Sequence, residues 1–194
     1  MSEDIRKHVA EAIETHKSMV AEFEQRGIET IAAIAEATVR ALEQDGTVYL
    51  CGNGGSAADA QHVAGELVGR FRRERKALAA VALSTDTSVV TCIANDYSYE
   101  KVFARQVEAL VRKADILWAF STSGASANVI AAAEAAKKKG ACVVAFTGRS
   151  NSKLEQIAEI CFCAESESTA RSQEIHQLAY HIICDLIDRR FAND

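Results

Sequence analysis

Two histidines and a glutamate are the side chains of this sequence best suited to acid–base or metal chemistry. His62 and Glu66 are four residues apart, so a helix containing both places them on one face. Gln173, Gln177 and His181 recur at intervals of four in a second, otherwise apolar segment. Polar side chains on a buried helix need partners. We therefore expect functional roles for Gln173 and His181, whereas His62 and Glu66 taken alone also suit a solvated helix face.

A glycine-rich loop precedes the segment that contains His62. Asn53, Gly54, Gly55 and Ser56 follow an apolar run and lead into a predicted helix. Glycines let the backbone turn sharply and leave amides free to bind an anion or a sugar hydroxyl at the positive end of a helix. The loop lacks both the Gly-Lys-Ser/Thr ending of a P-loop and the dinucleotide G-x-G-x-x-G pattern. A tight strand-to-helix turn without a ligand is the alternative.

A second loop is rich in hydroxyl side chains, which belong to Ser121, Thr122, Ser123 and Ser126. It follows a predicted strand and leads into a helix that starts near Ser126. Hydroxyl groups and the free amides of a helix start make a phosphate cradle that needs no lysine. The alternative is a serine-rich N-cap. Two such loops in one sheet strengthen the ligand interpretation of both.

Two further polar groups have less certain roles. Asn95 and Asp96 end a predicted strand, where they either bind substrate hydroxyls or cap a helix. The only basic cluster is the run 70–76, which is interrupted by Glu74. A solvated face or a subunit contact is the expected role of this run.

The elements that position these groups alternate in type. Helical spacing covers residues 5–23 and 28–42, and a strand–helix alternation follows. The order predicts a mostly parallel sheet covered on both faces, a three-layer α/β/α sandwich of the α/β class, with the ligand crevice at the carboxyl ends of the strands. The run 89–94 would also suit a helix. The predicted strands are 47–51, 79–83, 89–94, 116–120, 141–146 and 160–163, and the predicted helices that alternate with them are 57–71, 99–111, 126–139, 152–157 and 169–191.

Composition bounds the class of protein. The 194 residues include 48% hydrophobic and 25% charged residues, typical of a folded domain. We expect a single domain over 1–194, with N-terminal helices in 1–45 and an α/β core in 46–194. The formal net charge of −5 argues against a protein that wraps nucleic acid. The N-terminus resembles neither a signal peptide nor a membrane span, so a cytoplasmic protein without a membrane partner is expected, its six cysteines reduced and mostly in the core.

Several motifs in order resemble the sugar isomerase (SIS) domain family, and within it the bacterial phosphoheptose isomerases. The motifs are C-G-N-G-G-S-A-A-D-A-Q-H from residue 51, A-N-D-Y-S-Y-E from residue 94, S-T-S-G-A-S from residue 121, and Q-E-I-H from residue 173 followed by His181. The resemblance implies a flavodoxin-like SIS fold. The chain departs from the family at Lys76 and Ala79, where prolines are usual, and at Ala170, where some relatives have an acidic residue.

The resemblance also implies an activity and its residues. It implies the aldose–ketose isomerisation of D-sedoheptulose 7-phosphate to D-glycero-D-manno-heptose 7-phosphate, the entry step toward the heptose of lipopolysaccharide. Such a reaction needs one base and one acid, for which Glu66 and His181 are the natural choices. The phosphate is expected on the loop of residues 121–126. The residues implied for substrate binding are Asn53, Gly54, Gly55, Ser56, Glu66, Asn95, Asp96, Ser121, Thr122, Ser123, Ser126 and Gln173.

A metal and an assembly are implied as well. His62, Glu66, Gln173 and His181 offer two imidazoles, a carboxylate and an amide oxygen, a set that suits one zinc ion per subunit. The family implies a homotetramer with the N-terminal helices between subunits, although the apolar stripe of Ile5, Val9 and Ile13 fits packing within one chain equally. Two rival functions share the fold: a non-catalytic SIS adaptor that binds the bacterial replication initiator, and an isomerase of another sugar phosphate. An adaptor has no need of Glu66 and His181.

Overall fold

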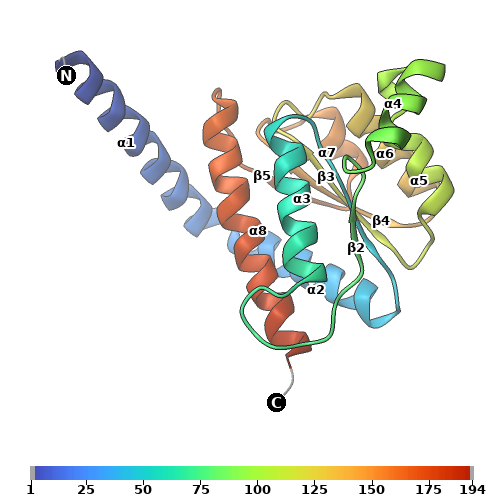
Figure 1. The fold of residues 1–194 in the computed structure, drawn as a ribbon. Coiled ribbons are helices and arrows are strands. Elements are labelled where there is room, and N and C mark those ends of the chain that lie inside the picture. Colours follow the sequence, from blue (N-terminus) through green and yellow to red (C-terminus); the bar gives the residue numbers. More distant parts are fainter. Residues whose placement is uncertain (1–2, 193–194) are drawn as a thin grey trace.

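The computed structural model describes residues 3–192 of the chain as a helix-flanked sheet (Figure 1). In order, the elements are α1 (Glu3–Arg26), α2 (Ile28–Glu43), β1 (Val48–Cys51), α3 (Gly55–Val68), β2 (Ala80–Ala82), α4 (Thr87–Asp96), the 3-10 helix η1 (Tyr99–Lys101), α5 (Ala104–Leu110), β3 (Ile116–Ser121), α6 (Ala127–Lys138), β4 (Cys142–Thr147), α7 (Lys153–Ile157), β5 (Ile160–Cys163) and α8 (Thr169–Phe191).

The sheet has five parallel strands in the order β2-β1-β3-β4-β5. This order is the flavodoxin-like one. The chain moves to one side of β1 to form β2 and to the other side to form β3, so the strand order reverses between β1 and β3. The loops after β1 and β3 flank this switch point, where open α/β sheets bind their ligands.

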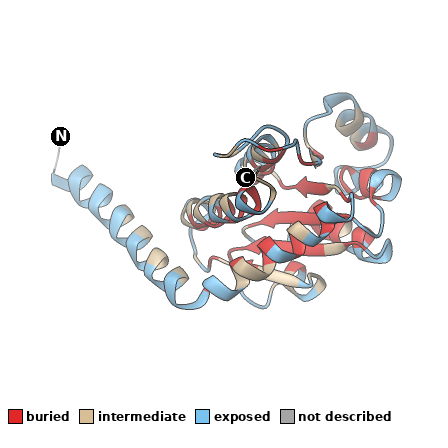
Figure 2. Cartoon of the chain, turned by 90° about the horizontal axis from the view of Figure 1, so that it is seen from below, coloured by how far each residue is buried: buried red, intermediate tan, exposed pale blue. Residues whose placement is uncertain are grey.

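Two apolar cores make the sheet the middle of three layers. Helices α2, α3 and α8 pack on one face around Trp118, Phe120 and Phe146. Helices α5, α6 and α7, with Ile93 of α4, pack on the other face. Figure 2 shows the buried strands between these helical layers. The predicted three-layer α/β/α sandwich is confirmed.

The prediction of a strand at 89–94 is wrong, because this run lies inside helix α4. The side chain of Asp86 accepts a hydrogen bond from Val89 N at 3.0 Å and caps the helix start. Only Ile93 of the helix is buried, so the β-branched residues that suggested a strand lie on a surface helix. The predicted helix 99–111 is also divided, into η1 and α5.

Helix α1 projects away from the body of the molecule (Figures 1 and 2). It has no buried residue, and Ile5, Val9 and Ile13 are about half exposed. Packing of this stripe within one chain, one of the two alternatives left by the sequence, is therefore not observed. No helix in the described part of the chain combines the length and apolar character of a membrane span.

All six cysteines are free, as predicted. Burial raises the pKa of Cys51 and of Cys184 to about 12, so both thiols stay protonated and inert. Cys142, Cys161 and Cys163 are partly buried. Cys92 is the exception to the predicted core location, because α4 places it on the surface.

Candidate active site

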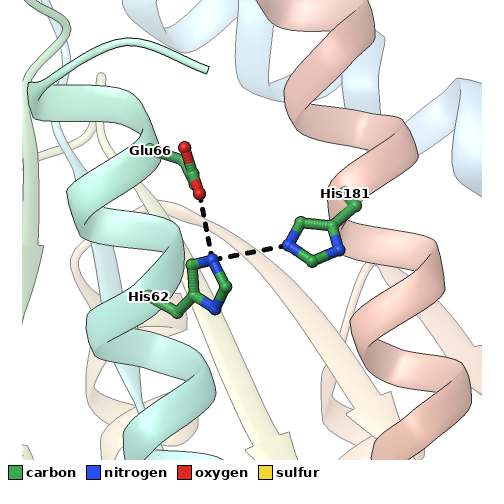
Figure 3. Close-up of side chains that lie close together, drawn as sticks. All are labelled: His62, Glu66 and His181. Atoms are coloured by element: carbon green, nitrogen blue, oxygen red, sulfur yellow. Dashed lines mark hydrogen bonds and ion pairs between the residues drawn. The ribbon is translucent and has the colours of Figure 1, made fainter. Parts of the chain in front are cut away.

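The acid–base candidates meet between α3 and α8, which run side by side (Figure 1). His62 and Glu66 share one face of α3, and α8 presents His181 to that face (Figure 3). Nε2 of His62 is 2.9 Å from Oε1 of Glu66 and 3.4 Å from Nε2 of His181. Ligand atoms of the three side chains lie within 4.8 Å of one another. His62 is exposed, but Glu66 and His181 are partly buried, so these side chains do not form the fully solvated helix face of the alternative interpretation.

Tyr180 contacts the other side of the His62 ring and links it to Asp59. The Tyr180 hydroxyl donates to Oδ1 of Asp59 at 3.3 Å and lies 3.4 Å from Nδ1 of His62. Burial raises the pKa of Asp59 to about 6, although the Tyr180 bond and nearby His62 work to lower it. The hydroxyl occupies the Nδ1 side of His62 and leaves Nε2 to face Glu66 and His181.

The pKa of His181 differs from that of an exposed histidine. Burial, with repulsion from His62, holds its pKa below the ordinary value, and the Glu66 carboxylate only partly opposes this. The imidazole is therefore mostly neutral at pH 7. A neutral imidazole has one N–H to donate and one lone pair for a proton or a metal.

The glycine loop carries α3 into this site. Gly54 has φ +54°, which side chains disfavour. A Cβ on Gly55 would lie 2.6 Å from Nε2 of Gln173, so glycine allows α8 to approach the loop. The same Gln173 amide is 3.5 Å from Oγ of Ser56. The structure thus places Gln173 against the loop, at the start of α3.

Asn53 connects the two loops at the switch point. It exchanges two hydrogen bonds with Asn128 on α6, each 2.8 Å long. Its Oδ1 also accepts from the Tyr99 hydroxyl at 3.0 Å. Because the Asn53 amide is occupied on both atoms, it fixes the spacing of the loops in addition to any contact with a ligand.

The hydroxyl loop does not behave as a simple N-cap. Ser126 occupies the N-cap position of α6, but its side chain makes no capping bond. Its Oγ is 2.9 Å from Oγ of Ser121, which is 3.3 Å from Oγ of Ser123. Oγ1 of Thr122 is 3.5 Å from Oγ1 of Thr169 in the first turn of α8.

The starts of α3, α6 and α8 are joined by these contacts. The Asn53–Asn128 pair links the first two, the Gln173–Ser56 contact links α8 to α3, and the Thr122–Thr169 contact links α8 to the loop before α6. Helix N-termini carry partial positive charge and unpaired amides. Three of them beside a group of hydroxyls make this end of the sheet suited to a phosphate.

A sequence model of the SIS domain matches residues 13–148. The chain belongs to the SIS domain family. A phosphoheptose isomerase from Roseiflexus sp. (strain RS-1) is 52% identical over 172 residues, which are 87% of each chain. Another, from Helicobacter pylori (strain Shi470), is 52% identical over 155 residues, covering 80% of this chain and 81% of the relative.

Solved structures give the same result for the fold. The phosphoheptose isomerase GmhA from Neisseria gonorrhoeae superimposes on this SIS domain with a TM-score of 0.89 and 42% sequence identity. The match covers 95% of this chain and 99% of the other. The similarity therefore includes the N-terminal helices, the loops at the switch point and α8.

Asn95 and Asp96 are not at a strand end, which corrects the location inferred from the sequence. They are exposed at the end of α4, where Nδ2 of Asn95 donates to Oδ1 of Asp96 at 2.9 Å. They do not cap the start of a helix either. The segment after α4 reaches the switch point through Tyr99, whose role the sequence did not reveal.

The sequence did not single out four other residues, of which three support the site and the fourth, Asp188, bonds to Arg75 and to the loop that follows α3. Asn128 has no distinctive spacing, and Tyr180 is hidden among the apolar residues of α8. Asp59 gave a weak signal, since it lies one turn before His62. Asp188 gave a stronger one, because it is a charged residue beside Ile187 and four residues after Cys184, on the buried stripe of α8.

Proposed function

We propose that this SIS domain enzyme isomerises D-sedoheptulose 7-phosphate to D-glycero-D-manno-heptose 7-phosphate, the first reaction toward the heptose of lipopolysaccharide. The observation that carries the proposal is that Glu66 and His181 face each other within a chain that matches phosphoheptose isomerases over most of its length. Those relatives' names supply the substrate class. A non-catalytic adaptor would not require this pair of side chains.

The proposed reaction moves one proton between neighbouring carbons. Glu66 takes a proton from C1 of the open-chain ketose while His181 gives its N–H proton to the carbonyl oxygen at C2, which yields an enediol. Glu66 returns its proton to C2, and the hydroxyl on C1 returns a proton to His181 as the aldehyde forms. A mostly neutral imidazole suits this role, because a neutral histidine also polarises the carbonyl in the isomerisation of triose phosphates, a reaction of the same type.

The hydroxyl loop binds the phosphate in this proposal. Ser121, Thr122, Ser123 and Ser126 donate hydroxyls, and the start of α6 contributes amides. Gly55 and His62 are seven residues apart on α3, a rise of about 10 Å. An extended seven-carbon sugar phosphate spans such a distance, so its phosphate and its reacting carbons occupy different ends of the site. Asn53, Ser56, Gln173, Asn95, Asp96 and the amides of Gly54 and Gly55 remain the candidates for binding hydroxyls.

A zinc ion fits the cluster by the chemistry of its donors. His62 and His181 both direct Nε2 toward the space that Glu66 faces, and such electron-rich atoms repel one another unless a proton or a cation lies between them. Two imidazoles and a carboxylate form a ligand set of catalytic zinc sites, which keep a further position open. We propose Gln173 as the additional ligand, which requires its amide to leave the contact with Ser56 at the start of α3. When bound, zinc supplies positive charge that polarises the substrate carbonyl.

We further propose a cytoplasmic homotetramer. The apolar stripe of Ile5, Val9 and Ile13 stays exposed on a helix that projects from the molecule, and a second copy of the chain is the partner that would cover it. Six free cysteines are consistent with a reducing compartment.

Incubation of the purified protein with sedoheptulose 7-phosphate, followed by NMR, tests the activity. We expect the aldose 7-phosphate to appear, faster with added zinc. If the protein converts only another ketose phosphate, it is an isomerase of a different sugar phosphate. If it converts no sugar phosphate, with or without zinc, the adaptor function is favoured.

A further inference from the structure

One ion pair in the described part of the chain has both side chains almost fully buried. Nε of Arg75 donates to Oδ1 of Asp188 at 2.9 Å, and the two side chains are 1% and 0% exposed. Arg75 belongs to the basic run 70–76, for which the sequence predicted a solvated face or a subunit contact. For Arg75 that prediction is wrong, because the residue reaches inward to α8.

The guanidinium of Arg75 closes the carboxyl end of α3. Nη2 donates to the carbonyl of Glu66 at 2.7 Å, and Nη1 donates to the carbonyls of Leu67 and Gly69 at 3.0 Å and 3.4 Å. The last turn of α3 contains no basic residue of its own. Arg75 therefore supplies both the hydrogen bonds and the positive charge that a helix carboxyl end requires.

Asp188 holds the same loop from the side of α8. Its Oδ2 accepts from the backbone amides of Arg72 and Arg73 at 3.0 Å and 2.7 Å. Burial works to raise the pKa of Asp188, but these two amides and the Arg75 guanidinium outweigh it and hold the pKa below its ordinary value. The carboxylate stays charged and bonded at neutral pH.

The pair therefore spans the two helices that build the candidate active site. Arg75 binds the carbonyl of Glu66 itself, and Asp188 lies on α8 seven residues, about two turns, after His181. Stability is a weak reason for a buried ion pair, because well-packed apolar side chains often stabilise as much. Fixing the position of α3 relative to α8 is another reason for the pair, because Arg75 also donates to the backbone of α3.

We propose that Arg75 and Asp188 form a clamp that sets the position of Glu66 relative to His181. They are positioning residues, since neither contacts the reacting atoms. The proposal rests on the proposed function in that the cluster is taken to bind zinc and to transfer the proton. Loss of the clamp leaves the hydroxyl loop unchanged, so it lowers kcat and zinc affinity and has little effect on KM.

A double variant tests the positioning role. Arg75→Met with Asp188→Leu replaces the pair by apolar side chains and removes the bonds to α3. We expect a Zn²⁺ dissociation constant raised about 10-fold to 100-fold in a chelator competition and a kcat lowered by a similar factor. The melting temperature should fall as well, because the carbonyls at the end of α3 and the amides of Arg72 and Arg73 lose their partners. Native zinc affinity and kcat in this variant would overturn the proposal.

Two further variants keep the test decisive. If the double variant fails to fold, Arg75→Lys retains the charge with a smaller set of donors, and we expect a several-fold loss of zinc affinity; native affinity would overturn the clamp. Val107→Ala, in the opposite apolar core, is the matched control. It should lower the melting temperature and leave kcat and zinc affinity unchanged, and an equal loss of kcat in this control would assign the effects to stability.

Hydrogen exchange distinguishes failure of the clamp from failure of the proposed function. If the native protein neither isomerises the sugar phosphate nor binds zinc, the proposed function fails. The clamp still predicts that the amides of residues 67–69 exchange at least tenfold faster in the double variant, or in Arg75→Lys, while the first turns of α3 keep their protection. Unchanged exchange in residues 67–69 would contradict it.

Discussion

Glu66 has two competing uses, as a base toward carbon and as a ligand to zinc, and His181 likewise has two, as the acid and as a ligand. The Glu66 carboxylate is close enough to His62 and His181 for either. Replacing Glu66 by glutamine separates the two uses. An amide oxygen remains a weak ligand and a hydrogen-bond acceptor, but it cannot remove a proton from carbon at neutral pH.

Glu66→Gln is therefore expected to fold and bind substrate while kcat falls by about 10²–10⁴-fold, the usual contribution of general-base catalysis. Exchange of the C1 proton with deuterated solvent should fall by the same factor, which NMR measures directly. Glu74→Gln makes the same chemical change at a well-exposed side chain and should leave both rates unaltered. Near-native exchange in Glu66→Gln would restrict Glu66 to a ligand or structural role.

The hydroxyls of Ser121 and Ser126 bond to each other and not to the start of α6, which makes their loss informative. Ser121→Ala or Ser126→Ala removes a donor to a charged oxygen, worth about 1.5–3 kcal/mol. We expect the dissociation constant of the substrate, or of inorganic phosphate, to rise about tenfold to a hundredfold, with the melting temperature almost unchanged.

Asp86→Ala is the control for that experiment, since Asp86 is a true N-cap, on α4. It should lose about 1 kcal/mol of stability with no change in phosphate affinity. If the serine variants behave like Asp86→Ala, the serines only stabilise the start of α6.

At this scale, the sequence predicted the side chains that can do chemistry better than those that support them. Spacing by four identified His62 and Glu66, because a helix imposes that period regardless of its surroundings. Asn128 and Tyr180 act through contacts made 75 and 118 residues away along the chain, which no local pattern encodes.

At the scale of elements, the predictions were correct where the hydrophobic residues of a segment followed one clear pattern. The five strands of the sheet were predicted because each is a short apolar run between helical segments. The run 89–94 failed because a capping residue and one buried side chain were sufficient to make it helical, against its β-branched composition. As a result, the sequence placed Asn95 and Asp96 at a strand end that does not exist.

Helix α8 has a histidine in its buried face that the proposed chemistry does not use. His176 is fully buried against the rings of Phe120, Phe146 and Phe162. Its Nε2 donates to the carbonyl of Thr147 at 2.8 Å, and its Nδ1 has no partner. A second ring proton would have no acceptor, and burial lowers the pKa of His176 to about 4 despite the Thr147 bond.

This histidine should make the fold sensitive to acid. Its pKa is lower in the folded chain than the ordinary 6.5 of the unfolded chain, so between pH 6.5 and 4 the unfolded state binds more protons. We expect its contribution to the free energy of unfolding, complete above pH 6.5, to fall by about 3 kcal/mol as the pH drops through this window. Urea titrations at several pH values measure the change.

His176→Gln removes the titrating group and retains an amide that can donate to Thr147. Its stability should depend less on pH by about the same 3 kcal/mol. Asp59 acts in the opposite direction, because its raised pKa favours the folded state as the pH falls, but it is present in both proteins and cancels from the comparison. Parallel pH profiles for the two proteins would show that His176 does not control acid stability.

For the whole molecule, the sequence indicated the fold and the family but left the arrangement of α1 undecided. A stripe of apolar residues looks the same whether it packs on its own chain or on another. The structure shows that the sheet is already covered by α2, α3 and α8 on one face, with α1 outside this layer. Only the part of α1 from Ala12 onward contacts the body: Met19, Val20 and Phe23 pack on the core, and Ala12 and His16 make polar contacts with α8.

The exposed part of α1 predicts an effect on assembly without an effect on the fold. Val9 is 52% exposed and contacts no core, so Val9→Glu removes nothing from the folded monomer. A charge buried in a subunit interface is costly. We therefore expect light scattering to change from a tetramer, four times the 21.0 kDa chain mass, to smaller species, with native circular dichroism.

Ser18→Glu introduces the same charge on the opposite face of α1 and should leave the tetramer intact, because nine residues turn a helix by half a revolution beyond two full turns. A native protein that scatters as a monomer would refute the assembly, and equal dissociation by both variants would assign the effect to charge and not to the stripe.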